Sequence, residues 1–196
     1  RRDFIKTAGV TALAISPIGF LSGCGSRTKA PGSEPQKAGE MTYRINEAKN
    51  DKVSILGYGC MRWPMKKNEE GKDIIDQEKV NELIDYALEK GVNYFDAAPV
   101  YLQGQCEAAT GEALSRHPRE SYFVATKLSN FNDASRAEGI RMYKASLEAF
   151  RTDYLDYYLL HSIKNAATFT KRFVDNGLID FLMEERKAGR IRNLGF

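Results

Sequence analysis

The sequence reads VNYFDAAPVY at residues 92–101, YFVATK at residues 122–127 and LDYYLLH at residues 155–161. In each stretch a short apolar run leads directly into an ionisable residue, namely Asp96, Lys127 and His161. Apolar runs of about four to eight residues between polar segments are typical of strands that are buried on both faces. The three stretches therefore predict buried strands, each with an ionisable side chain at its carboxyl end.

Helical patterns separate these strands. Asp76 can cap a helix whose apolar residues share one face and which ends at Gly91. We expect an earlier buried strand at 53–59 (VSILGYG), with 42–46 (TYRIN) as its hairpin partner. Further along the chain we expect a short helix at 107–115, helices around 140–150 and 178–189, and a last strand at 191–196. This βαβαβαβαβ order predicts a parallel sheet with helices outside it.

Such alternation fits either a barrel or an open, doubly wound sheet. The first predicted strand is not followed by the G-x-G-x-x-G pattern of a dinucleotide-binding turn. Pro64 follows Gly59 closely, which prevents an immediate helix whose N-terminus could receive a pyrophosphate. A Rossmann-type site is therefore disfavoured. In a barrel, by contrast, the carboxyl ends of neighbouring strands meet at one mouth.

The motifs FDAAPVY, VATK and YYLLH resemble those of the aldo-keto reductase family. The resemblance runs from about Thr42 to Phe196, and LGYGCMR and IRNLGF fit the family's first and fifth strands. It implies an α/β fold, a (β/α)8 TIM barrel that is incomplete here, with about five of the eight strands. It also implies a small-molecule carbonyl substrate and NADP(H) or NAD(H) as the cofactor.

The resemblance implies a catalytic tetrad of Asp96, Tyr101, Lys127 and His161. Reduction of an aldehyde or ketone needs a hydride on carbon, which a nicotinamide supplies, and a proton on oxygen. A phenol with a pKa of about 10 donates slowly near neutral pH, so the Lys127 cation would bring Tyr101 into range as the general acid. Asp96 would hold Lys127 by an ion pair, and His161 would orient the substrate carbonyl.

The first loop carries the other expected cofactor contacts. Cys60 and Met61 match positions where the family's first loop meets the cofactor, and Asp96 is expected to touch it as well. A Cys60–Cys106 disulfide is an alternative state of these thiols in an exported protein. The loop after Tyr101 is longer than the family usually has, so the choice of substrate does not carry over. His117 is expected in a surface loop at the opposite end of the barrel.

The N-terminal segment has the pattern of an export signal. It begins RRDFIK, continues without a charge from Thr7 to Phe20, and reaches LSGC at Cys24. The start is similar to a twin-arginine signal and the end to a bacterial lipobox, in which Cys24 would be lipidated. We therefore expect residues 1–24 to be the signal, 25–41 a flexible linker and 42–196 the barrel domain, and the protein to be exported as a periplasmic or envelope-anchored lipoprotein.

Composition narrows the remaining classes of function. The 196 residues are 42% hydrophobic and 28% charged with a formal net charge of +3, which disfavours disorder and a nucleic-acid partner. We expect the protein to associate with a membrane only through the signal or a lipid anchor.

A complete barrel takes about 250 residues, so we expect an inactive N-terminal part of a longer gene product, whose missing C-terminal part could hold an iron–sulfur cluster. Two rivals stay open: a metal-dependent hydrolase using Asp96 and His161 as ligands, and a non-catalytic exported binding module.

Overall fold

The computed structural model describes residues 40–47, 49–131 and 135–196. The predicted signal, the lipidation site at Cys24 and nearly all of the predicted linker lie outside these residues. The strands are β1 (Tyr43–Asn46), β2 (Asp51–Ser54), β3 (Tyr58–Gly59), β4 (Met65–Lys67), β5 (Asp73–Ile75), β6 (Tyr94–Asp96), β7 (Phe123–Leu128), β8 (Leu155–Leu160) and β9 (Ile191–Gly195). The α-helices are α1 (Gln77–Glu89), α2 (Cys106–Leu114), α3 (Arg136–Ala149), α4 (Ala166–Phe169) and α5 (Leu178–Lys187). Short helical turns are η1 (Cys60–Arg62), η2 (Tyr101–Gly104), η3 (Arg119–Ser121) and the π-helical η4 (Thr170–Val174).

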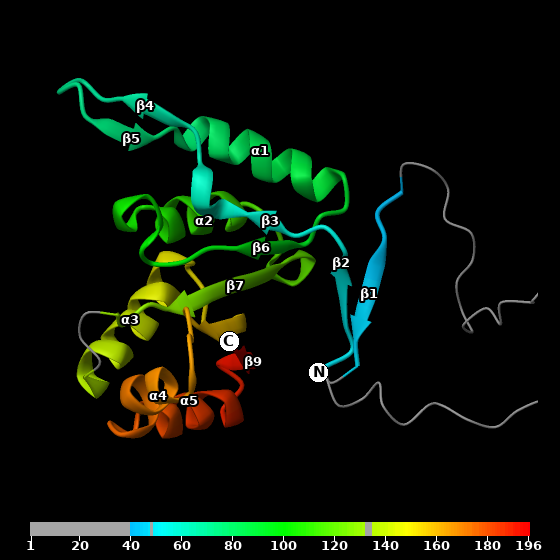
Figure 1. The fold of residues 1–196 in the computed structure, drawn as a ribbon. Coiled ribbons are helices and arrows are strands. Elements are labelled where there is room, and N and C mark those ends of the chain that lie inside the picture. The colour runs from blue at the N-terminus through cyan, green and yellow to red at the C-terminus, as the bar shows by residue number, and fades with distance from the viewer. Residues whose placement is uncertain (1–39, 48, 132–134) are drawn as a thin grey trace, which may run out of the picture. The chain divides into compact units, whose positions relative to one another are not determined.

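The main sheet has five strands in the order β3-β6-β7-β8-β9, and every neighbouring pair is parallel. The helices α1, α2, α3 and α5 connect or follow these strands along the chain (Figure 1). Strand order therefore follows chain order, as successive right-handed crossovers produce in a barrel wall. The predicted alternation of strand and helix is confirmed.

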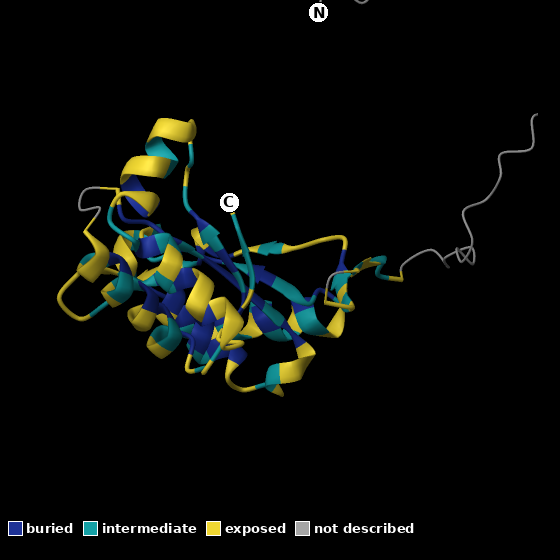
Figure 2. Ribbon diagram, turned by 90° about the horizontal axis from the view of Figure 1, so that it is seen from below, coloured by how far each residue is buried: buried dark blue, intermediate teal, exposed yellow. Residues whose placement is uncertain are grey.

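The helices cover one face of this sheet. The partly exposed residues of β7 and β8 all lie on one face of the sheet: Phe123, Lys127, Tyr157 and Leu159. Ala125 and Leu155 on that face are buried, and the residues of the other face are all buried: Val124, Thr126, Leu128, Asp156, Tyr158 and Leu160. Tyr143 of α3 packs on Tyr158 with ring centroids 5.4 Å apart, so the buried set faces the helices, where Figure 2 shows the buried residues gathered. A doubly wound sheet would have helices on both faces. The arrangement is that of an incomplete barrel, with the partly exposed set on what we call the inner face.

The expected strand at 53–59 is wrong as a single element. Residues up to Ser54 belong to β2, which pairs antiparallel with β1, and only Tyr58 and Gly59 join the main sheet. Between them Ile55 and Leu56 are 62% and 59% exposed. The reason is a contact that is distant in sequence: the Ser54 backbone N–H donates to the Asn93 side chain, which diverts the chain from the sheet ladder. The hairpin itself, predicted from 42–46, is confirmed with a different partner range.

Two elements have no counterpart among the expected ones. Strands β4 and β5 form a second antiparallel hairpin, whose turn contains Gly71 with a φ of 75°. The segment from α4 through η4 fills the connection between β8 and α5, and Asn165 caps its start by accepting from the Thr168 N–H. In the part of the chain described here, no helix is long and apolar enough to span a bilayer.

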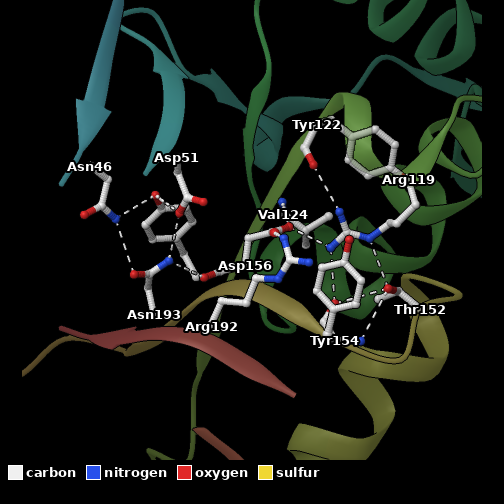
Figure 3. Close-up of polar contacts among 11 residues, drawn as sticks. Asn46, Asp51, Arg119, Tyr122, Val124, Thr152, Tyr154, Asp156, Arg192 and Asn193 are labelled. Atoms are coloured by element: carbon white, nitrogen blue, oxygen red, sulfur yellow. Dashed lines mark hydrogen bonds and ion pairs between the residues drawn. The ribbon is translucent and has the colours of Figure 1, made fainter. Parts of the chain in front are cut away.

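A buried carboxylate ties together the amino-terminal ends of the main strands (Figure 3). Asp156, only 1% exposed, accepts from Arg119 at 2.6 Å, from Arg192 at 3.1 Å and from the Val124 N–H at 2.9 Å. A buried charge is tolerated when it is paired and its remaining lone pairs are hydrogen-bonded, which these three donors achieve. This network belongs to the fold and lies away from the carboxyl ends of the strands.

The β1–β2 hairpin closes the same amino-terminal end from the inner face. Asn46 donates to Tyr157 and to Asn193, and both of these residues also donate to the Asp51 carboxylate at 3.2 and 3.3 Å (Figure 3). Tyr157 and Asn193 come from β8 and β9, so the hairpin bridges the two strands. The opposite end of the inner face is left for the site.

Candidate active site

The three predicted strand ends meet at the carboxyl end of the sheet. Asp96 is the last residue of β6, Lys127 lies near the end of β7, and His161 directly follows β8. The Lys127 ammonium contacts Asp96 Oδ1 at 2.5 Å and the Ala97 carbonyl at 2.7 Å. The Lys127 side chain is 12% exposed and that of Asp96 33%. Because solvent screens this ion pair only partly, the two groups fix each other's position.

Tyr101 reaches the same place from the loop after β6. The Lys127 ammonium lies 5.0 Å from the centroid of the Tyr101 ring, and the Tyr101 and His161 rings meet edge to face with centroids 6.0 Å apart. The chain turns sharply after Tyr101, because Leu102 and Gln103 both adopt left-handed backbone conformations with φ of 49° and 56°. Non-glycine residues rarely adopt this conformation, so the surrounding structure must hold the turn. The four residues of the predicted tetrad are thus brought together.

The environment of His161 favours its neutral form. Burial, followed by the Lys127 and Arg172 cations, lowers the pKa of this imidazole, and the Asp96 carboxylate opposes that shift. Nδ1 of His161 lies 2.7 Å from the Ser129 hydroxyl. Arg172, 7% exposed, donates to the His161 carbonyl at 2.8 Å and to the Asn130 side chain at 2.9 Å. Ser129 therefore fixes the ring of His161, and Arg172 fixes its backbone.

Cys60 and Met61, the two cofactor contacts expected in the first loop, differ in their exposure to solvent. Cys60 is 0% exposed and Met61 is 52% exposed, so of these two side chains only that of Met61 faces solvent. The Cys106 thiol donates to the Cys60 carbonyl at 3.1 Å, and both thiols are free rather than joined as a disulfide. Burial raises the pKa of Cys60 well above its usual value and that of Cys106 to about 11. The role of Cys60 and Met61 toward a cofactor stays a prediction.

The structure also places the residues of the alternative metal site and His117. Among the residues that the structure describes, no three His, Cys, Asp or Glu side chains are grouped to hold a metal ion, and the Asp96 carboxylate is engaged by Lys127. His117 lies after α2, where its Nε2 pairs with Asp85 Oδ1 at 2.6 Å. Its partner is a helix carboxylate, and it does not take part in the strand-end cluster.

Comparison with known proteins settles the family. A model of the aldo/keto reductase family matches residues 55–196. This chain belongs to the aldo/keto reductase family. The match contains all four residues of the cluster, from Asp96 to His161.

Individual aldo/keto reductases agree with this membership. Methylglyoxal reductase YeaE of Escherichia coli K12 is 34% identical over 109 residues, which are 56% of this chain and 36% of YeaE. The holo form of an aldo-keto reductase from Bacillus halodurans is 30% identical, with a TM-score of 0.61 over 80% of this chain and 50% of that one. An aldo-keto reductase from Klebsiella pneumoniae in complex with NADPH shares the fold at 24% identity, with a TM-score of 0.60 over 80% of this chain and 49% of that one. The chain thus spans about half the length of these relatives or less.

Ser129 and Arg172 are the site residues that the sequence did not reveal. Ser129 lies two residues after Lys127 and would itself be read as the start of a loop. Arg172 lies in η4, in a segment for which no element was expected. Ser129 becomes recognisable only from the strand register in the structure: the residue just beyond the end of β7 faces the residue just beyond the end of β8, which is His161.

Proposed function

We propose that the protein reduces the carbonyl group of a small aldehyde or ketone with hydride from NADPH or NADH. The observation that carries this proposal is the partly buried Lys127–Asp96 ion pair, with Tyr101 and His161 beside it at the carboxyl ends of the strands. A barrel enzyme works at this end of its sheet. The chain spans about half the length of the relatives that it matches or less, so this activity is proposed for the protein as a whole.

The residues present fit a bound nicotinamide nucleotide. Gly59, the register partner of Asp96, has no atom within 4 Å of the place a Cβ would occupy, which leaves room beside the ion pair. Asp96 uses Oδ1 for Lys127, so Oδ2 can accept from a hydroxyl group of a nucleotide. Met61, exposed on the first loop, would add apolar contact. The four polar residues supply protons and hydrogen bonds but no electrons, and the nicotinamide supplies the hydride when bound.

Each residue of the cluster then has a distinct task. Tyr101 donates the proton that the carbonyl oxygen requires, as a general acid. Lys127 holds positive charge 5.0 Å from the Tyr101 ring and so stabilises the phenolate left after proton transfer. Asp96 fixes Lys127 in this position. The neutral His161 imidazole donates a hydrogen bond to the carbonyl oxygen, which orients the substrate and stabilises its developing charge.

Substitution of Tyr101 tests this function. We expect the full-length protein to oxidise NADPH in the presence of a carbonyl compound such as methylglyoxal, and Tyr101→Phe to bind the nucleotide but lose at least about a hundredfold in kcat. Tyr86→Phe is the matched control, because Tyr86 lies 60% exposed on α1. Nucleotide binding is followed separately by fluorescence quenching. If neither wild type nor variants bind NADPH or NADH, the reductase proposal fails and a non-catalytic binding module takes its place.

We propose further that the protein is exported and lipidated at Cys24. The support is the order of the two sequence motifs, a twin-arginine start followed by LSGC. Labelling of cells with a radioactive fatty acid tests it: wild type should carry label in the envelope fraction and Cys24→Ser should carry none. The resemblance also implies an iron–sulfur cluster, and iron analysis of the purified full-length protein tests it.

A further inference from the structure

Ser129 faces His161 across the ends of two paired strands. The β7–β8 ladder runs to the pair Leu128 and Leu160, and the His161 N–H continues it by donating to the Leu128 carbonyl at 3.1 Å. The next position on each strand brings the Ser129 hydroxyl to 2.7 Å from His161 Nδ1. Ser129 is 5% exposed, so water cannot easily replace this bond. The contact is therefore set by strand register and not by a mobile loop.

The charges around His161 favour a neutral ring. The cations that act on it are Lys127 from β7 and Arg172 from η4, and the opposing carboxylate is Asp96 from β6. Asp96 is already paired with Lys127, so it compensates little of the positive charge. The Arg172 guanidinium contacts the His161 carbonyl at 2.8 Å, which places a permanent charge close to the ring. A neutral imidazole has one protonated and one bare nitrogen.

The hydrogen bond from Ser129 determines which ring nitrogen of His161 is unprotonated. Within residues 40–47, 49–131 and 135–196, its recorded side-chain hydrogen bond is the one to His161 Nδ1. If Nδ1 carried the proton, the ring would donate to the hydroxyl oxygen and the buried hydroxyl proton would lack an acceptor. If the hydroxyl donates instead, its proton is satisfied and Nδ1 accepts. A buried donor without a partner is costly, so the second arrangement prevails.

We propose that Ser129 is a positioning residue that fixes His161 as the tautomer protonated on Nε2. This inference rests on the proposed function, because only a protonated Nε2 can donate to a substrate carbonyl while Nδ1 is engaged by Ser129. Ser129 itself does not touch the substrate. It acts through the ring, and Arg172 helps by holding the backbone of His161.

The tautomer can be measured without any substrate. In 15N NMR spectra of the whole protein labelled on histidine, we expect wild-type His161 to show a bare Nδ1 and a protonated Nε2. Ser129→Ala should lose this strict preference, and Ser129→Thr, which keeps a hydroxyl, should restore it. His117 is the internal control, because its Nε2 pairs with Asp85 and its signals should not change. Assignment of the two rings follows from a His161→Gln variant.

Steady-state kinetics gives the second readout. Ser129→Ala should lower kcat/KM for the carbonyl compound by about tenfold, as expected for one lost hydrogen bond, while the affinity for NADPH stays unchanged. Ser129→Thr should recover most of that loss. A wild-type His161 protonated on Nδ1, or a Ser129→Ala variant with unchanged tautomer and unchanged kinetics, overturns the inference. If the tautomer behaves as expected but wild type reduces no carbonyl, the proposed function fails and the role of Ser129 in the ring's tautomer stands.

Discussion

Gly111 and Gly139 allow a direct test of how the helices pack against one another. Both glycines lie inside helices, Gly111 in α2 and Gly139 in α3. A Cβ on Gly111 would lie 2.1 Å from the Ala149 carbonyl oxygen and 2.7 Å from the Phe150 Cα. A Cβ on Gly139 would lie 2.3 Å from a methyl carbon of Leu178. The same substitution therefore meets backbone at one position and the flexible end of a side chain at the other.

The expected magnitudes follow from this difference. Replacing glycine by alanine in a helix interior stabilises it by about 1 kcal/mol at either position. Overpacking costs about 1–3 kcal/mol, and Gly111 falls at the upper end because α2 and the end of α3 must move apart by about an ångström. The end of the buried Leu178 side chain can shift off its rotamer, which costs about 1 kcal/mol and offsets the gain at Gly139. We expect Gly111→Ala to destabilise the protein by about 2 kcal/mol and Gly139→Ala to be close to neutral.

Urea denaturation followed by tryptophan fluorescence measures both variants. Trp63, the single tryptophan of this sequence, donates to Thr110 at 2.9 Å and so reports on the residue next to Gly111. A loss of about 2 kcal/mol corresponds to a fall in Tm of roughly 4–8 °C for a protein of this size. Equal stability of the two variants would refute the close approach of α2 to the end of α3.

Three further outcomes can be checked on the same protein. Asp156→Ala should cost about 3–5 kcal/mol of unfolding free energy in urea denaturation, because it leaves two arginine side chains without their buried carboxylate. In a Cys24→Ser background, Cys60 and Cys106 should react slowly with iodoacetamide at pH 8 until guanidinium unfolds the protein, since burial raises the pKa of both thiols; fast native labelling would contradict their burial. The lowered pKa of His161 means that the unfolded state takes up its proton first, so unfolding free energy should fall as pH drops below about 6.5, and less so in His161→Gln.

The parts of the fold that the sequence predicted are those fixed by burial. The strands at β6, β7 and β8 and the helix α1 follow from apolar runs and from one apolar helix face, and the structure confirms them. The strand at 53–59 was misplaced because its apolar residues Ile55 and Leu56 are exposed, and a hydrogen bond between Ser54 and the distant Asn93 controls the path of the chain. Contacts between residues far apart in sequence leave no local pattern to detect.

The same distinction applies to the site. Asp96, Lys127 and His161 could be predicted because parallel strands bring their carboxyl ends together, and Tyr101 followed from the resemblance of its motif. Ser129 was missed because a serine after a strand has an ordinary local role in turns. Its role becomes visible only once the register of β7 and β8 is known.

Two charged residues on neighbouring strands show how the sheet separates structural groups from chemical ones. Asp156 of β8 is buried, and two arginines and the Val124 N–H occupy its oxygens, so its charge supports the fold. Lys127 of β7 points to the inner face, where its ammonium group has two recorded acceptors, Asp96 and the Ala97 carbonyl, for three N–H bonds. A lysine that is fixed by two bonds but retains a third proton and its charge can still act on a neighbour, and Tyr101 lies within 5.0 Å. The side of the sheet on which a strand residue falls therefore determines whether its charge supports the fold or remains available for chemistry.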